Sequence, residues 1–182
     1  MLGRLADIFI RVMDGVNRLT LWLMAGLMAL MTAAITIQVL VRFTAKMQGI
    51  RMSAPWTEEL ARYAMIWIVF LGLGLGFRHR MLIALTFVVE KLNLRWGQVL
   101  QYIALAISFA FLLVLFDLGM GAVGFGAMEK SPVLKIPKTW VYWSMPVGAV
   151  LACLNIITLV LVTLRSGGDI RRPDSDLQMT ED

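Results

Sequence analysis

A cluster of charged side chains lies at residues 58–62, directly before a long apolar stretch. Glu58 and Glu59 precede Arg62 by four and three residues, so on a helix they share a face with the guanidinium and can pair with it. Both acids would also lie in the first helical turn, where the helix dipole favours negative charge. The spacing predicts ion pairing at a helix start. It leaves two interpretations open, namely local pairing alone or the docking of a partner subunit.

The remaining candidates for chemistry are few. His79 is the single histidine and stands between two arginines, which is typical of an interface residue. One histidine excludes a two-histidine haem or zinc site within this chain, and one cysteine, Cys153, excludes an intrachain disulfide. The sequence also lacks the phosphate-binding motif G-x-x-x-x-G-K-[ST] and the nucleophile motif G-x-S-x-G. We therefore predict no metal, no cofactor and no enzymatic activity.

Asp117 would be a proton-relay candidate if it lay inside a membrane. It follows an uncharged run over residues 96–116, which is 21 residues long and covers about 31 Å as a helix. That length places Asp117 at the outer interface. A boundary or contact role is therefore favoured over proton transfer.

The elements that position these residues follow from composition. Hydrophobic residues make up 59% of the 182 residues and charged residues 16%, against about 45–50% and about 25% in soluble domains. Three uncharged runs exceed the roughly 20 residues that a transmembrane helix needs, and a fourth, residues 63–77, becomes long enough with its flanks. We predict an all-α membrane domain over residues 19–164, with spans at about 19–41, 58–77, 96–117 and 139–164.

Three further segments flank these spans. Within residues 1–18, apolar and charged residues alternate at helical spacing, which predicts an amphipathic helix lying on the membrane; a solvated helix packed on another subunit is the alternative. The uncharged residues 81–89 are too short to cross and predict a short in-plane cytoplasmic helix after the second span. Residues 165–182, rich in glycine and acids, predict a flexible cytoplasmic tail.

Charge and aromatic residues indicate the orientation. The net charge of +5 is spread between the apolar runs, which favours membrane lipids over nucleic acid as the anionic partner. With the N-terminus inside, the inner segments hold ten Lys and Arg and the outer segments seven, which favours cytoplasmic termini. The aromatic anchors expected at the membrane interface are Trp56, Trp96, Trp140 and Trp143.

The centres of the spans offer few polar groups, among them Thr32, Ser108 and Asn155, and these can bond within their own or neighbouring helices. A transporter with its own substrate pathway would show polar groups at mid-membrane or interrupted helices. The sequence therefore predicts a four-helix accessory membrane protein. A small multidrug-type exporter and a membrane anchor subunit of a redox complex remain as alternatives.

The sequence resembles the DctQ-type small membrane subunit of tripartite ATP-independent periplasmic (TRAP) transporters. The resemblance rests on WTEELARY at residues 56–63, WIVFLG at 67–72, FRHR at 77–80, IPKTWVY at 136–142 and PVG at 146–148. It covers residues 15–164 in element order. One departure is the apolar run Ile83-Ala84-Leu85, where relatives often carry a more polar sequence.

The resemblance implies a supporting role in a larger complex. In that family a periplasmic substrate-binding protein captures an organic acid anion, and a large membrane subunit carries it with sodium by an elevator-like motion. The small subunit is paired with the large one in the bacterial inner membrane. By position, Glu58, Glu59 and Arg62 match the family's charged block, and His79 matches a position often held by histidine. These four residues are the expected partner-interface candidates.

Overall fold

A computed structural model describes residues 2–47, 54–78 and 94–166 of the chain. These residues form the helices α1 (Leu2–Met47), α2 (Pro55–Arg78), α4 (Leu94–Gly126), α5 (Thr139–Tyr142) and α6 (Ser144–Ser166). Among the described residues, four stretches are long and apolar enough to cross a membrane, namely Ala6–Met47, Pro55–Arg78, Trp96–Gly126 and Thr139–Leu164. The predicted all-helical fold with four spans is confirmed at this level.

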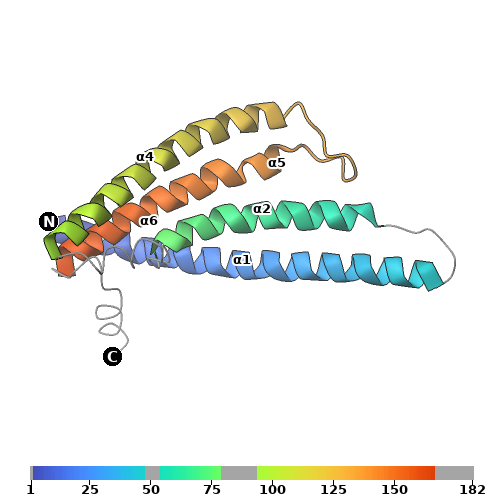
Figure 1. The fold of residues 1–182 in the computed structure, drawn as a ribbon, viewed down its shortest axis with the longest axis horizontal. Coiled ribbons are helices and arrows are strands. Elements are labelled where there is room, and N and C mark those ends of the chain that lie inside the picture. The colour runs from blue at the N-terminus through green and yellow to red at the C-terminus, as the bar shows by residue number, and fades with distance from the viewer. Residues whose placement is uncertain (1, 48–53, 79–93, 167–182) are drawn as a thin grey trace.

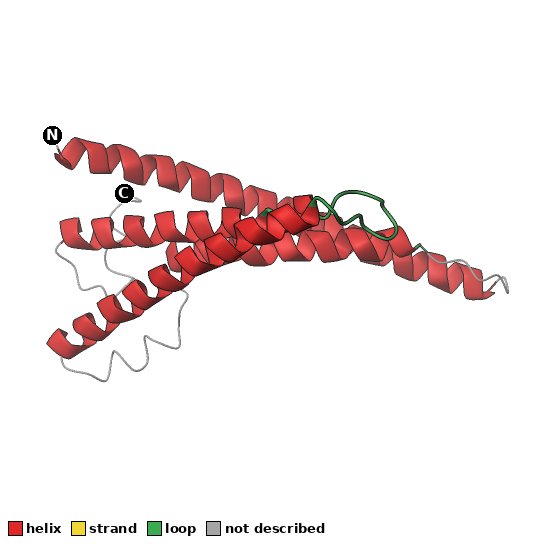
Figure 2. Cartoon of the chain, turned by 90° about the horizontal axis from the view of Figure 1, so that it is seen from above, coloured by secondary structure: helices red, strands yellow, loops and turns green. Residues whose placement is uncertain are grey.

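The long helices stand side by side in the order α1, α2, α6, α4 (Figure 1). In that order each helix packs on the next, and α1 also touches α6. Figure 2 shows the helices fanning apart toward the end that holds the start of α1. The start of α2, the end of α4 and α5 lie at the other end, which we call the hairpin end for the loop described below.

Two glycines let the central helices α2 and α6 approach closely. A Cβ atom on Gly148 would lie 2.5 Å from the carbonyl oxygen of Phe70, and one on Gly74 would lie 2.8 Å from the side chain of Leu151. Small residues at such positions allow helix backbones to come together in lipid. A cluster of buried apolar residues, with Phe77 from α2, Leu112 from α4 and Ala152 from α6 among its members, then fills the contact between the three helices.

Helix α1 is one continuous helix of 46 residues, with no break near residue 18. No proline interrupts it, and from Met13 to Ala45 its buried or half-buried residues recur every three or four positions, the pattern of a helix that packs along one seam. The separate helix predicted over residues 1–18 is therefore not confirmed. From Met13 on, the packed residues are Met13, Asn17, Thr20, Met24, Leu27, Met31, Ala34, Gln38, Val41 and Ala45, and before Met13 the half-buried residues are Ala6, Phe9 and Ile10.

Proline explains two helix boundaries. Pro55 is the first residue of α2, a position where the missing N–H costs nothing. Pro146 lies in the first turn of α6, and the stretch 139–164, predicted as one helix, is interrupted at Trp143 because Pro146 cannot donate a backbone hydrogen bond to the preceding turn. Helix α4 continues to Gly126, nine residues beyond the predicted end of its span at Asp117.

A buried amide pair joins three of the helices. The Asn17 and Asn155 side chains donate to each other, with N–O distances of 2.7 and 2.9 Å, and Asn155 also donates to the carbonyl of Gly74 at 3.0 Å. Asn17 is 5% exposed and Asn155 is fully buried. Near this pair, the Arg78 guanidinium contacts the Asp14 carboxylate at 2.6 Å. Helices α1, α2 and α6 are thus tied at one level.

Two predicted segments lie outside the described residues. They are the in-plane helix over residues 81–89 and, beyond the end of α6, the tail over residues 167–182.

We expect Asn17 and Asn155 to be strongly coupled in stability. Replacing Asn155 with Leu leaves the Asn17 amide without its donor and its acceptor, and the Gly74 carbonyl without the Asn155 donor. Leaving a buried polar group unsatisfied costs about 1–3 kcal/mol. Replacing both asparagines with Leu should cost less than the two single changes together. The free energy of unfolding in detergent is measured for the unmodified chain, the two single variants and the double variant. If the two single losses of stability add up to the loss in the double variant, the amide pair does not hold the helices.

Candidate partner-docking site

The Glu59 side chain fastens the α4–α5 loop to the start of α2. Its carboxylate accepts the Tyr63 hydroxyl at 2.6 Å and the backbone N–H groups of Val133 and Leu134 at 3.1 and 2.9 Å. The residue is only 9% exposed. A buried carboxylate needs such donors to offset the loss of water. Glu59 therefore acts as an internal clamp between segments more than 70 residues apart in the sequence.

The clamped loop is a hairpin over residues 129–138. Lys138 donates its backbone N–H to Glu129 at 3.0 Å, and Ser131 donates to Ile136 at 2.8 Å. Lys135 turns the chain with a φ of 57°, a conformation that costs a side-chain-bearing residue energy and persists only where its surroundings impose it. Figure 1 shows this segment extending past the ends of α4 and α5 along the long axis of the molecule.

An ion pair closes the base of the hairpin. The Lys138 ammonium lies 2.8 Å from the Glu129 carboxylate. The hydrogen bond and the charge of Lys138 lower the pKa of Glu129, and Glu129 in turn raises the pKa of Lys138. The stability that the lowered pKa of Glu129 provides is present above the ordinary carboxyl pKa and is lost as the pH falls. The pair is therefore charged at neutral pH.

Glu58 and Arg62 form the exposed part of the site. Their carboxylate and guanidinium are 3.1 Å apart, four residues apart on α2, and their side chains are 61% and 63% exposed. Glu58 thus pairs with Arg62 as predicted, whereas Glu59 bonds to Tyr63 and the hairpin. Exposed pairs of this kind contribute little to stability, so the two charges are available to a partner.

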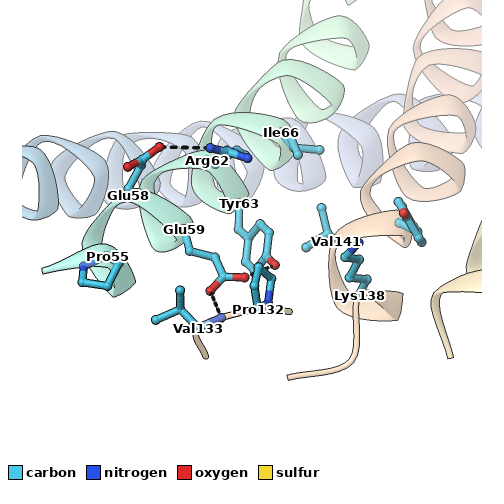
Figure 3. A pocket seen from close by; sticks show the side chains of 11 residues that line it. Pro55, Glu58, Glu59, Arg62, Tyr63, Ile66, Pro132, Val133, Lys138 and Val141 are labelled. Carbon is cyan, nitrogen blue, oxygen red and sulfur yellow. Dashed lines mark hydrogen bonds and ion pairs between the residues drawn. The ribbon is translucent and has the colours of Figure 1, made fainter. Parts of the chain in front are cut away.

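A cavity of about 410 Å³ lies between the start of α2 and the hairpin (Figure 3). Charged and apolar groups share its wall, which is typical of a surface that binds another molecule. It is lined by Pro55, Glu58, Glu59, Arg62, Tyr63, Ile66, Pro132, Val133, Lys138, Val141 and Tyr142.

The predicted aromatic anchors lie at helix ends. Trp56, Trp140 and Trp143 are at the hairpin end, at 43%, 69% and 40% exposure, and Trp96 is at the start of α4, at 70%. The Trp67 indole donates to the Trp140 carbonyl at 3.1 Å and joins α2 to α5. The positions fit membrane-interface anchors, which remains a prediction.

The other candidate residues do not join this site. His79 lies outside the described residues. Asp117 is exposed on α4, while Cys153 is half-buried and has no disulfide partner. Within residues 2–47, 54–78 and 94–166, no three His, Cys, Asp or Glu residues come together as metal ligands would.

Comparison with known proteins places the chain in a family. Residues 31–166 match the model of the DctQ component of tripartite ATP-independent periplasmic transporters. The chain belongs to the DctQ family. It is also 22% identical over 149 residues to a Haemophilus influenzae protein named as a TRAP transporter small permease protein, covering 82% of this chain and 89% of that protein. The match makes this chain a small permease subunit of multi-pass membrane type.

In this DctQ-family chain, sequence reasoning missed the partners of Glu59. The spacing of Glu59 and Tyr63, four residues on one helix, was a readable signal. The sequence gives no signal that the N–H groups of Val133 and Leu134 bind Glu59, because every non-proline residue has a backbone N–H group. Sequence reasoning also missed the ion pair of Glu129 with Lys138, although their spacing of nine residues fits the two ends of a hairpin.

We expect Glu59→Gln to loosen the hairpin and Glu58→Gln to leave it unchanged. The glutamine amide keeps the shape of the side chain but removes the charge that strengthens the Val133 and Leu134 bonds, at a cost of about 1.5–3 kcal/mol. That cost corresponds to roughly 10- to 150-fold faster amide hydrogen exchange at those two residues. Hydrogen–deuterium exchange with mass spectrometry measures it. Equal exchange in the two variants would contradict a clamping role for Glu59.

Proposed function

We propose that this DctQ-family subunit is a fixed scaffold for the large membrane subunit of a TRAP transporter. The complex takes up an organic acid anion that a periplasmic binding protein delivers, with sodium as the coupling cation. Membership of the DctQ family carries this proposal. The Haemophilus influenzae relative, named as a TRAP transporter small permease protein, supports it.

The disposition of buried polar groups supports a role without substrate chemistry. The Asn17 and Asn155 amides bond to each other and to the Gly74 carbonyl. Other hydroxyl groups in the spans, such as those of Thr20 and Thr158, donate to the carbonyl four residues earlier in the same helix. Groups used in this way are not free to bind an ion or an anion in passage.

We propose that both termini are cytoplasmic and that the membrane is the bacterial inner membrane. The start of α1 and the end of α6 lie at the same end of the molecule, as four spans require. The excess of Lys and Arg in the inner segments selects the side. The hairpin end then faces the periplasm, where the binding protein delivers its substrate.

The scaffold hypothesis predicts no transport by this subunit alone. Reconstituted in vesicles by itself, the chain should move no radiolabelled organic anion under a sodium gradient. Vesicles that also hold the large subunit, with binding protein added, should accumulate it. Uptake by the isolated chain would contradict the scaffold role.

We propose that Glu58 and Arg62 contact the large subunit. Exchanging their charges, in the variant Glu58→Arg with Arg62→Glu, keeps a pair at the same spacing but reverses the pattern that a partner meets. We expect the exchanged variant to recover less of the large subunit in affinity purification, by roughly five- to tenfold. Asp7→Lys, an exposed acid near the start of α1, is the control. Full recovery by the exchanged variant would limit Glu58 and Arg62 to local pairing.

A further inference from the structure

Positive charge dominates the described part of the hairpin end. Six cations and three acids lie over the last turns of α1, the first turns of α2 and the hairpin 129–138. Each acid is engaged within the chain: Glu58 by Arg62, Glu129 by Lys138, and Glu59 by backbone N–H groups and Tyr63. The cations are Arg42, Lys46, Arg62, Lys130, Lys135 and Lys138.

Two hairpin lysines are left for a partner. Lys130 and Lys135 are exposed, and neither takes part in an ion pair with any residue that the structure describes. They stand on the two opposite arms of the hairpin, since Lys130 forms an isolated bridge with Pro137, and Lys135 is next to Ile136, whose carbonyl accepts the Ser131 N–H. The hairpin therefore presents two lysines that are not neutralised within this part of the chain.

The backbone that carries these lysines is fixed. Glu59 holds the N–H groups of Val133 and Leu134, between the two lysines. Lys135 has a φ of 57°, where glycine would fit at lower cost. A chain that only attracts anionic lipid needs no fixed geometry, because flexible basic segments bind such membranes. Fixed geometry instead favours a folded partner, since it lowers the entropy lost on docking.

We propose that the hairpin 129–138 docks on an acidic surface of the periplasmic substrate-binding protein, with Lys130 and Lys135 as the contacting cations. This proposal rests on the proposed function, which supplies the partner. Charges at the rim of an interface act mainly on the rate of encounter. The hairpin thus guides the loaded binding protein to the membrane complex, and a weak, salt-sensitive contact permits its release.

The test uses the complete complex in vesicles, with uptake measured against binding-protein concentration at low and high salt. The variant Lys130→Glu with Lys135→Glu should need roughly tenfold more binding protein for half-maximal uptake at low salt, and the difference should shrink at high salt. The matched control, Arg4→Glu with Arg11→Glu, makes the same charge change on exposed residues near the start of α1. It should behave as the unmodified chain does.

A second variant separates docking from folding. Lys135→Gly removes the cation and relieves the positive φ, so it should preserve or strengthen the hairpin. We expect slower hydrogen exchange at Val133 and Leu134 together with a smaller, roughly threefold, rise in the binding protein needed. Unchanged uptake in both hairpin variants would overturn the docking proposal.

Two further outcomes would also overturn the docking proposal, and a third would contradict the proposed function itself. Loss of the large subunit from the hairpin variants would make the hairpin an assembly surface. A defect that follows the anionic lipid content of the vesicles, instead of the binding-protein concentration, would make the hairpin a membrane contact. If the unmodified chain fails to co-purify with the large subunit, the proposed function itself fails, whereas the first two outcomes leave the scaffold role intact.

Discussion

A polar group buried between helices in a bilayer has no water to bond with, so its partner must come from the protein. The Asn155 side chain meets this constraint by bonding to α1 through Asn17 and to α2 through Gly74. Apolar contacts alone would let the helices slide, because lipid competes equally well for apolar surface. The directional amide bonds fix the register of three helices. The close approach of α2 and α6 at Gly148 depends on that register.

Glu59 meets the same constraint at the hairpin end. Its carboxylate is buried at the start of a helix, where the helix dipole stabilises negative charge, and it accepts hydrogen bonds from Tyr63 on the same helix and from two N–H groups of the hairpin. The Asn17–Asn155 pair lies within the bundle, and the hydrogen bonds of Glu59 lie at its end. Together they hold α2 in place against α6, α1 and the connection from α4.

The lipid around the helices decides which features of the structure can be predicted from the sequence. Run lengths located the spans because a bilayer demands long uncharged stretches, and the Glu58 and Arg62 pair followed from helical spacing. The packed face of α1 was not found, since a helix surrounded by lipid is apolar on all sides and hydrophobicity does not distinguish its seam. The three- and four-residue spacing from Met13 to Ala45 becomes meaningful only once Asn17 and Thr20 are known to be buried on it. Hydrogen bonds between residues far apart in the sequence, such as that of Glu59 with Val133, cannot be predicted from local spacing.

The proposed scaffold role requires a rigid subunit more than it requires groups that bind a substrate. A subunit that moves substrate by an elevator motion must slide against a neighbour that does not deform. A row of helices supplies that stiffness only if its members cannot shift along one another, and here the amide pair and the Glu59 clamp prevent the shift. The apolar side chains left exposed on the outer helices, including Trp22 on α1 and Phe111 on α4, are then free to meet lipid or the large subunit without loss of the bundle's shape. The buried polar residues Asn155 and Glu59 therefore act by fixing geometry, so a substitution at either of them should affect transport through the fit between subunits.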